Sequence, residues 1–237
     1  MSRRLTLFSV LLGAAAAIVA AAILVSSSGP GGRDRHLPRT PTPTPRDVTA
    51  ILRGIPQDRL TLGDPDAPIL LVEFVDLQCP FCRQFAADSW PDIVRRYIRT
   101  GKVKMELRLT AVLGEDSAKA NRAVMAAGLQ DRAWDASMRF YDVQGQENTG
   151  YVTDDFLRGV LSGVRGLDLA RAMKQRSSAA VRDELGAVYS MQRRYGVGST
   201  PTLLIGTDDT DLTLVAEGVV SSENLAQAIN QQLLKTV

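Results

Sequence analysis

The sequence predicts an α/β domain with a large block of helices inserted between its strands. Three observations predict this fold class. An apolar run at 69–75 is typical of a buried strand, and a helical segment follows it directly. Residues 115–190 are largely helical, in several pieces that glycines separate. Beyond residue 201 the chain returns to two short strands and a final helix.

The first expected elements are a short segment and a strand. The short segment lies at 47–53 and is followed by the turn signal GDPDAP. The strand at 69–75 is apolar except for Glu73, which lies inside it. A helix is then expected to begin at Cys79, close to the end of this strand.

The helix that begins at Cys79 is expected to run towards Ser89. Trp90-Pro91 indicates a break or a kink, because proline lacks the amide hydrogen that a helix interior needs. A second helical stretch is expected at 91–99. Residues 102–109 then alternate between apolar and polar side chains, which is the period of a strand.

The last elements follow the helical block. Two short strands are expected at 201–206 and 212–217, joined by the acidic segment TDDTD. The final helix is expected at 222–234, because its apolar residues recur at helical spacing. Ser221 or Ser222 is the expected cap of this helix, since a serine side chain can accept a hydrogen bond from a free amide of the first turn.

The N-terminal residues differ in composition from the rest of the chain. Arg3 and Arg4 precede residues 5–25, which contain no charge. As a helix at about 1.5 Å per residue, this run is long enough to span a bilayer. It exceeds the apolar region of about 7–15 residues in a cleavable signal, although the alanines at 20–22 would suit a signal peptidase. The pattern favours an uncleaved anchor over a cleaved signal, with the bulk of the chain outside the cytoplasm.

A linker separates this segment from the folded domain. Residues 26–45 are rich in Ser, Gly and Pro, and their Thr-Pro repeats favour an extended spacer. The single histidine of the chain, His36, lies in this linker. We therefore expect an anchor or signal at 1–25, a linker at 26–45 and a folded domain at 46–237.

Composition excludes some function classes. Hydrophobic residues make up 45% of the chain and charged residues 23%, as in a globular protein with a core. The formal net charge is only +2. A chain so close to neutral gives no electrostatic reason to expect a nucleic-acid partner.

The two cysteines of the chain, Cys79 and Cys82, stand in the sequence CPFC and allow three interpretations. A structural zinc site needs four ligands, and the only histidine lies in the linker, so a metal site is disfavoured. A structural disulfide this short would stabilise the fold by roughly 2 kcal/mol, against roughly 4.7 kcal/mol for a loop of a hundred residues. A redox pair fits best, because close spacing lets the second thiol attack and a helix N-terminus lowers the pKa of the first.

A second signal lies at 197–206, in the sequence VGSTPTLLIG. Pro201 heads an apolar strand, where a proline occurs at a strand start or an edge. A cis bond before Pro201 would be a specific feature of the fold. Taken alone, this segment would predict an ordinary trans bond before a proline in a loop. In a chain that also contains CPFC, the cis interpretation is favoured.

Together these motifs resemble those of a known family. EFVDLQCPFC, followed much later by GVGSTPTLLIG, resembles the DsbA-like thiol:disulfide oxidoreductases, a branch of the thioredoxin superfamily with an inserted helical domain. The resemblance covers about 63–237 and rests on the CPxC, the late TPT and the helical block between them. It implies a membrane-anchored bacterial form with a thioredoxin-like fold, whose helical insertion covers about 114–192.

The resemblance also implies roles for individual residues. Cys79 would be the exposed nucleophile and Cys82 the buried resolving thiol, and the two would form the disulfide of the oxidised state. Pro201 would be a cis-proline that faces them. Thr200 would offer backbone hydrogen bonds to a substrate peptide, as an added strand does. Pro80 and the following phenylalanine are expected at the same substrate-binding surface.

Two residues of the motif deserve separate interpretation. Glu73 matches an acidic residue that the family keeps beneath the active site. It is either a buried acid that moves protons for Cys82 or an outward strand carboxylate. Phe81 stands where the strongest oxidants of the family carry histidine. Phenylalanine offers neither a hydrogen bond nor a charge, so a weaker oxidant is expected.

The resulting hypothesis is an extracytoplasmic enzyme that introduces disulfides into exported, cysteine-containing clients. The oxidised pair would receive a client thiolate, form a mixed disulfide and be released reduced. No organic cofactor or metal is expected. By family resemblance, a quinone-linked membrane protein of the DsbB or VKOR kind would reoxidise the pair. A reductase or isomerase of exported disulfides, and a tethered binding or chaperone module whose disulfide modulates affinity, remain as alternatives.

Overall fold

The computed structural model describes residues 48–236 of the chain. The anchor or signal expected at 1–25 and the linker expected at 26–45 lie outside these residues. Among the helices at 48–236, none is both long enough and apolar enough to cross a membrane.

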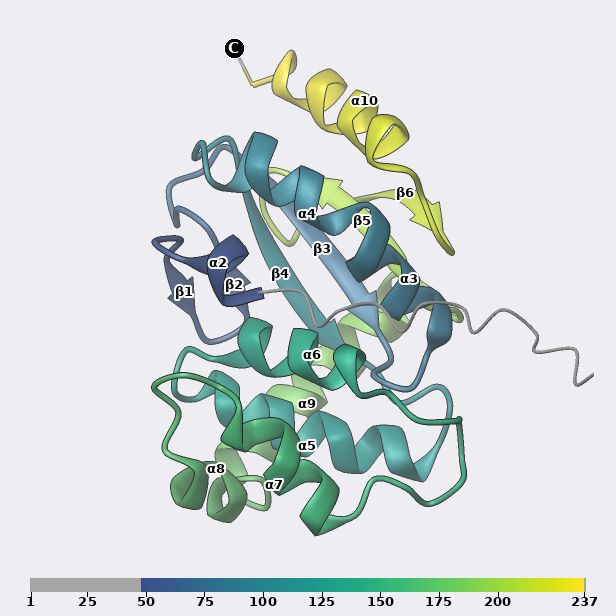
Figure 1. Ribbon diagram of the computed structural model, residues 1–237. Coiled ribbons are helices and arrows are strands. Elements are labelled where there is room, and N and C mark those ends of the chain that lie inside the picture. Colours follow the sequence, from purple (N-terminus) through teal and green to yellow (C-terminus); the bar gives the residue numbers. More distant parts are fainter. Residues whose placement is uncertain (1–47, 237) are drawn as a thin grey trace, which may run out of the picture. The chain divides into compact units, whose positions relative to one another are not determined.

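The described residues form a six-stranded mixed sheet in the order β1-β2-β4-β3-β5-β6 (Figure 1). The central strand β3 runs parallel to β4 and antiparallel to β5. The α/β class predicted from the sequence is therefore confirmed. The strands are β1 (Gln57–Asp58), β2 (Thr61–Leu62), β3 (Ile69–Val75), β4 (Val103–Leu109), β5 (Thr202–Gly206) and β6 (Thr213–Glu217).

Strand β3 lies in the middle of the sheet and is buried along its whole length. Because side chains alternate along a strand, it supplies two different apolar faces. Leu70, Val72 and Phe74 pack in a cluster that includes Met191 near the end of helix α9 (Ala179–Arg194). Its other residues face a larger cluster that contains both cysteines. Burial on both faces explains why β3 is apolar almost throughout.

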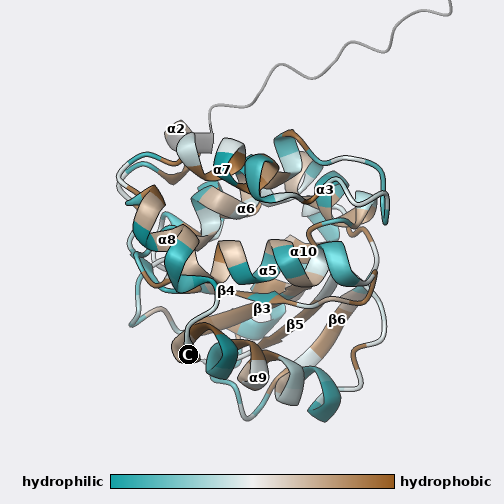
Figure 2. Cartoon of the chain, turned by 90° about the horizontal axis from the view of Figure 1, so that it is seen from below, coloured by the Kyte–Doolittle hydropathy of each residue, from teal (hydrophilic) through white to brown (hydrophobic). Residues whose placement is uncertain are grey.

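Helices cover the second face of the sheet. They contribute the buried side chains that share the larger cluster with β3, and Figure 2 shows that the inner strands are mostly hydrophobic whereas the helices around them carry hydrophilic stretches. These helices are α3 (Pro80–Asp88), α4 (Trp90–Ile93), the π-helical turn η1 (Val94–Ile98) and α10 (Ser222–Leu233).

The helical insertion lies between β4 and β5 in the chain. It occupies 115–194, close to the predicted 114–192. Three of its helices begin at a side chain that accepts a hydrogen bond from a first-turn amide, namely those capped by Thr153, Asp168 and Ser178. The helices of the insertion are α5 (Glu115–Gly128), α6 (Ala133–Asp142), α7 (Asp154–Ser162), α8 (Leu169–Gln175) and α9.

Local details agree with most of the sequence interpretation. The break at Trp90-Pro91 is confirmed, because α3 ends at Asp88 and α4 starts at Trp90, with Pro91 in its first turn. The helix expected at 91–99 is present as α4, which continues from Val94 as a π-helical turn. Ser221 is the cap of α10. The first described helix, α2 (Val48–Leu52), corresponds to the short element expected at 47–53. Strands β1 and β2 were not predicted, because two residues carry no periodic signal.

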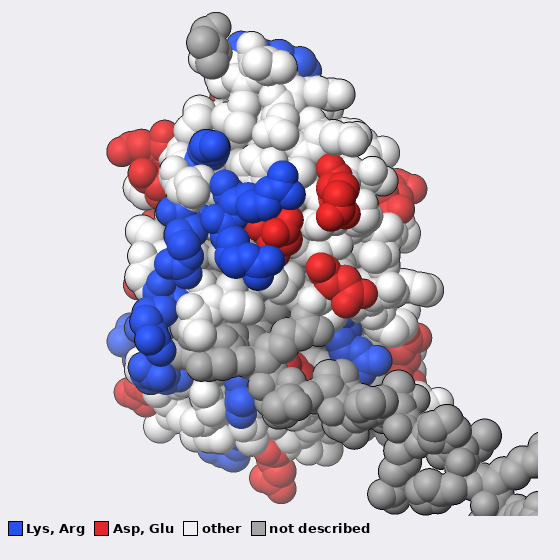
Figure 3. Space-filling view, turned by 45° about the horizontal axis from the view of Figure 1, so that its top comes forward, with Lys and Arg blue, Asp and Glu red and all other residues white. Residues whose placement is uncertain are grey.

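The surface carries mixed charges. Figure 3 shows Lys and Arg gathered on part of one face, with Asp and Glu among and beside them. Within this chain, Arg95 and Arg96 both pair with Asp92, and Arg99 donates to the backbone carbonyls of Ile51 and Arg53. These three arginine side chains thus bind a carboxylate or backbone carbonyls nearby, in line with the near-neutral net charge of the sequence.

Gly63 is the position where the fold most clearly requires glycine. Its φ is +111°, and a Cβ atom there would lie 2.9 Å from Ile98 Cγ2 and 3.1 Å from the Val103 carbonyl oxygen. We expect Gly63→Ala to lower the free energy of unfolding by about 1–3 kcal/mol, because both the backbone and the packing oppose the methyl group. Urea unfolding followed by circular dichroism measures the change.

Gly186, in the exposed face of α9, is the matched control for this prediction. A Cβ atom there meets nothing within 4 Å, and its φ is not positive. Gly186→Ala should raise the free energy of unfolding by about 0.5–1 kcal/mol, the helix propensity of alanine over glycine. Equal effects of the two substitutions would contradict the role assigned to Gly63.

Candidate active site

Helix α3 begins immediately after Cys79, which is its N-cap. The backbone of Cys79 is extended, with φ −68° and ψ 121°, and its amide donates to the Asp76 carbonyl at 3.0 Å. Pro80 takes the first helical position, where a missing amide hydrogen is not needed. Cys79 therefore lies at the positive end of the helix dipole, an environment that stabilises a thiolate.

The two thiols differ little in exposure. The structure holds the pair as free thiols, with Cys79 5% exposed and Cys82 fully buried. The expectation of an exposed Cys79 is therefore wrong, and the Thr200 carbonyl next to Pro201 is one group that contacts its sulfur. Cys79 remains the more accessible of the two.

The two thiols differ strongly in acidity. Hydrogen bonding to the Cys82 thiol, helped by Thr200 and by the backbone amides of Phe81 and Cys82, lowers the pKa of Cys79 to about 6 against the opposing effect of burial. Burial, with the neighbouring Cys79 as the next cause, raises the pKa of Cys82 well above its ordinary value. At pH 7 the pair therefore holds one thiolate, on Cys79, and one thiol, on Cys82.

The segment around Pro201 meets the CPFC motif in space. The Thr200–Pro201 bond is cis, as the sequence predicted. The Cys79 sulfur lies 3.3 Å from the Thr200 carbonyl oxygen. The pairing of Thr202 in β5 with Phe74 in β3 places this segment beside the end of β3. The structure thus brings together Cys79, Cys82, Thr200 and Pro201.

Glu73 is buried beneath the same site. Strand alternation puts it on the face of β3 that carries Leu71 and Val75, both in the apolar cluster with Cys82. The residues paired with Glu73 on the neighbouring strands are Leu107 and Leu203. The side chain is 2% exposed, and its Oε2 atom has no hydrogen-bond partner among the described residues. Burial raises its pKa to about 8, so the interpretation as an outward carboxylate is wrong.

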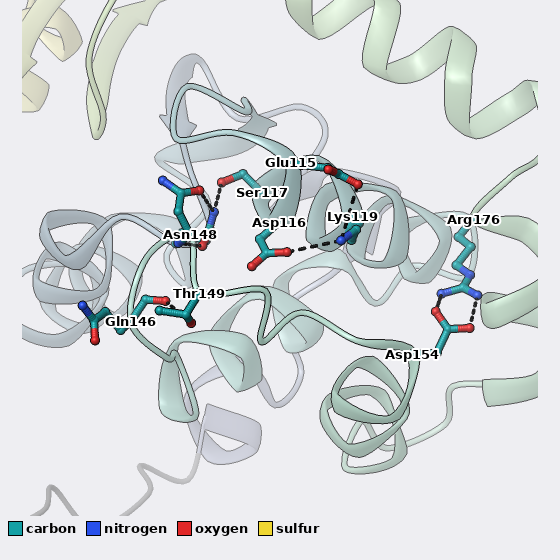
Figure 4. A network of polar contacts seen from close by, with 10 residues as sticks. Glu115, Asp116, Ser117, Lys119, Gln146, Asn148, Thr149, Asp154 and Arg176 are labelled. Atoms are coloured by element: carbon teal, nitrogen blue, oxygen red, sulfur yellow. Dashed lines mark hydrogen bonds and ion pairs between the residues drawn. The ribbon is translucent and has the colours of Figure 1, made fainter.

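A polar network, buried except at Asn148, fixes the turn before Cys79. One carboxylate oxygen of Asp76 accepts from the Gln78 amide at 2.9 Å and from the Ser117 hydroxyl at 2.6 Å. The Gln78 side chain donates to that hydroxyl at 2.8 Å and accepts from the Asn148 amide at 2.9 Å. In Figure 4, Ser117 and Asn148 lie next to each other at this network. Polar residues directly after an apolar strand were the only sequence signal for it.

The end of α6 brings two further groups that the sequence analysis missed. Gln144 Nε2 donates to the carbonyls of Leu77 and Cys79, at 2.7 and 3.1 Å. The Tyr141 hydroxyl is buried without a hydrogen-bond partner in the described chain. Burial, and after it the nearby Cys82 and Glu73, raise the pKa of Tyr141 well above its ordinary value. The insertion therefore contributes directly to the surroundings of the dithiol.

Exposed apolar side chains occur in the segments around Cys79. Phe81 is 58% exposed, Val143 50% and Val219 39%. Phe81 lies in the first turn of α3, and Val143 precedes the glutamine that contacts the Cys79 carbonyl. Val219 follows Gly218, whose amide donates to the Pro201 carbonyl at 2.7 Å. Each of these three segments therefore carries one apolar side chain that is open to solvent.

The site offers few groups for a metal. Within residues 48–236, no cluster of three or more His, Cys, Asp or Glu side chains is placed to hold an ion. Near the dithiol the acidic side chains are Glu73, which is surrounded by apolar residues, and Asp76, whose oxygens accept hydrogen bonds. The chemistry that the arrangement supports is that of the two sulfur atoms.

Comparison with known proteins agrees with this fold. Residues 56–230 match the sequence profile of a protein family described as Thioredoxin. The chain is also 26% identical, over 150 residues, to a Bacillus cereus protein named "Probable disulfide bond formation protein D". That alignment covers 61% of this chain and 68% of the relative.

Two solved structures show a similar fold. BdbD from Bacillus subtilis, in its oxidised form, superposes with a TM-score of 0.63 at 21% identity, covering 75% of this chain and 93% of that structure. Alpha-DsbA1 from Wolbachia pipientis gives a TM-score of 0.63 at 20% identity, covering 78% and 94%. These likenesses extend over the sheet and the helical insertion together.

The burial of Glu73 predicts a specific dependence of stability on pH. Its folded pKa of about 8 lies above the ordinary 4.5, so the folded state binds the proton more tightly than the unfolded state. The stabilisation that protonated Glu73 gives the folded state is complete below about pH 4.5, and it is lost as the pH rises through about 8. We expect Glu73→Gln to remove that loss, so that the variant gains stability relative to the wild type between pH 5 and 9.

The size of this effect has an upper limit of about 5 kcal/mol, the free energy of a pKa shift of about 3.5 units. Urea unfolding at several pH values, with both cysteines in the dithiol form, measures the difference. Glu147, exposed in the loop after α6, provides the control substitution Glu147→Gln. A pH-independent difference between the wild type and Glu73→Gln would contradict the buried, protonated state of Glu73.

Proposed function

The chain belongs to the thioredoxin family, and from this premise we propose that it is a thiol:disulfide oxidoreductase whose catalytic pair is Cys79 and Cys82. The observation that carries the proposal is the difference between the two thiols. Cys79 has a pKa of about 6 at the start of a helix, while the pKa of its buried neighbour is raised. A structural pair would have no need of one stabilised thiolate next to a protonated thiol.

The proposed reaction is the transfer of a disulfide from the pair to a client. A client thiolate attacks Cys79 Sγ, the Cys79–Cys82 bond breaks, and Cys82 leaves with the electron pair and takes up a proton. A second client thiolate then attacks the client sulfur of the mixed disulfide, and Cys79 leaves as a thiolate. The client loses two electrons and gains a disulfide, and the pair ends as a dithiol.

The side chains around the pair support these steps. A low pKa makes Cys79 a good leaving group in the second attack. Cys82 must be protonated when it leaves, since burial disfavours its thiolate. Glu73 has a pKa of about 8 and lies on the face of β3 that faces the cluster with Cys82. We propose it as the source of that proton. Thr200, Pro201, Pro80 and the exposed Phe81 form the proposed contact surface for the client.

We further propose that the net direction is oxidation. Stabilisation of the Cys79 thiolate favours the dithiol form, and a dithiol favoured in this way is a stronger oxidant. A reductase or an isomerase of the same family remains the alternative, and a measured potential at or below that of thioredoxin, roughly −270 mV, would favour it. A binding module without catalysis would leave the rate of client oxidation unchanged in Cys79→Ser.

The proposed site of action is outside the cytoplasm. The uncharged run at 5–25 after two arginines supports a single-pass anchor, and the linker at 26–45 supports a tether for the catalytic domain. Clients would then be exported proteins with cysteines. An enzyme that gives away its disulfide needs a reoxidant, for which we propose a quinone-linked membrane protein of the DsbB or VKOR kind.

Replacement of the resolving thiol tests the order of the two cysteines. In Cys82→Ala, the Cys79 thiolate can still attack a client disulfide, so that one client sulfur leaves as a thiolate and the other stays bound to Cys79. No internal thiol is then left to break this mixed disulfide. We therefore expect disulfide-linked client adducts to accumulate in cells that express this variant and to be absent with Cys79→Ser. Non-reducing gels followed by reduction detect them. Adducts in a Cys79 variant, and none with Cys82→Ala, would reverse the assignment.

Phe81→His tests the strength of the oxidant. A histidine beside Cys79 would add a hydrogen bond or a charge to the thiolate, worth roughly 1.5–3 kcal/mol. Because about 1.4 kcal/mol corresponds to about 30 mV in a two-electron couple, the potential should rise by some tens of millivolts. The Cys79 pKa should fall below the present value of about 6. Thiolate absorbance against pH and equilibration with glutathione measure both quantities, and an unchanged pKa would refute this explanation.

A further inference from the structure

A glutamine amide from the insertion contacts the turn that carries Cys79, in addition to the polar network of Ser117 and Asn148. Gln144 lies in the α6–α7 loop (143–153), just beyond the end of α6. Its Nε2 group donates to the Leu77 carbonyl at 2.7 Å and to the Cys79 carbonyl at 3.1 Å. One side chain thus joins the carbonyls of the two residues that flank Gln78.

This contact joins parts of the chain that are distant in sequence. Gln144 is 67 residues from Leu77 and 65 from Cys79. The Cys79 carbonyl also accepts the first hydrogen bond of α3, from the Arg83 amide at 3.2 Å. Gln144 therefore acts on the carbonyl where the catalytic helix starts, and both of its amide hydrogens are used there.

The loop that carries Gln144 is itself fastened to the same turn. Asn148 donates its amide to Gln78 Oε1 at 2.9 Å, and Gln78 Nε2 contacts Ser117 Oγ in α5. Figure 4 shows Asn148 and Ser117 close together, with Gln146 and Thr149 further along the loop. The glutamine is thus presented by a loop with a defined position, although most of that loop is exposed.

The electrostatic consequence follows from the partial charges. The carbonyl oxygens of Leu77 and Cys79 are the negative ends of dipoles in the turn that carries the Cys79 sulfur. An amide donor neutralises part of this negative charge and keeps both carbonyls directed at the insertion. The amides at the start of α3 then remain the groups that face the sulfur.

We propose that Gln144 is a positioning residue for thiol–disulfide exchange, through which the helical insertion holds the Cys79 turn in its reactive conformation. The proposal rests on the function proposed above for the dithiol. Gln144 contacts backbone carbonyls and touches neither sulfur, so its action is indirect. The insertion accordingly contributes to the reactivity of the nucleophile in addition to its contribution to the fold.

Gln144→Met tests this inference, since methionine has a similar length and no donor. The titratable groups around the pair, namely Cys82, Glu73, Asp76 and Tyr141, stay unchanged. We expect the Cys79 pKa to rise by about half a unit, the size of a weak hydrogen-bond effect. For a pKa near 6 at pH 7, that rise lowers the equilibrium constant for reduction of the pair by glutathione about two- to threefold.

Gln144→Glu should act in the same direction and more strongly. A carboxylate would replace the amide donor near the thiolate, and like charges repel. We expect a rise of about one pKa unit and a fall of about fivefold in the same equilibrium constant. The measurements are thiolate absorbance against pH and the glutathione equilibrium, on the full chain. Thermal unfolding of each variant reports its stability separately.

Gln130→Met is the matched control. Gln130 is also half-buried, and its amide bonds the backbone of Asp168, donating to the carbonyl at 3.2 Å and accepting from the amide at 3.0 Å. It lies in the insertion and contacts no residue of the Cys79 turn by a hydrogen bond. Loss of its hydrogen bonds to Asp168 should lower the free energy of unfolding without changing the Cys79 pKa or the equilibrium with glutathione.

Two results would overturn the proposal. An unchanged Cys79 pKa and an unchanged equilibrium constant in both Gln144 variants would show that this contact is structural only. Equal shifts in Gln144→Met and Gln130→Met would show a general effect of loosening the insertion. Failure of the proposed function would look different, since wild type and Cys79→Ser would then oxidise a model dithiol peptide at the same rate, whatever the pKa values.

Discussion

The start of helix α3 at Cys79 is the constraint on which the site depends. Two thiols only two residues apart would have similar properties in a flexible chain. Because the helix begins between them, Cys79 meets free amides at the positive end of α3, whereas Cys82 lies one turn further on, inside the apolar cluster. The hydrogen bond with Cys82 is the main cause that lowers the Cys79 pKa, and the amides at this helix start add to it, whereas burial raises the Cys82 pKa. The apolar strand before it and Pro80 after it both define where the helix can start.

Burial of the Glu73 carboxyl group beneath this helix lowers the stability of the fold, which a side chain with a purely structural role would not do. Glu73 stands in the central strand without a hydrogen-bond partner for one of its oxygens, at a place where the neighbouring strands supply leucines. An apolar residue there would stabilise the fold, since a buried polar group without a partner is unfavourable. Retention of a carboxyl group with a raised pKa beside Cys82 fits a site that must move a proton when a buried sulfur changes its charge.

Much of this arrangement could be predicted from the sequence. Contacts between residues far apart in the chain could not. The strand that contains Glu73 and the helix after Cys79 show in local patterns of apolar residues, and a resemblance between motifs placed Pro201 opposite the cysteines. The contacts of Gln144 and Ser117 could not be predicted, because each joins polar residues many positions apart with no periodic signal. The burial of Cys79 was missed for a similar reason, since its sulfur contacts the Thr200 carbonyl, 121 positions away in the chain.

The surroundings of Cys79 divide into two sides that act on the same thiolate by different means. Phe81 lies on the solvent side, in the first turn of α3 and 58% exposed, so few packing contacts are lost when its side chain is substituted. Gln144 lies on the insertion side and acts through backbone carbonyls. Because the two residues share no hydrogen-bond partner, their effects on the thiolate can vary separately. With the roles proposed above, the inserted helical domain adjusts the acidity of the nucleophile through Gln144, which lies apart from the proposed client surface at Phe81.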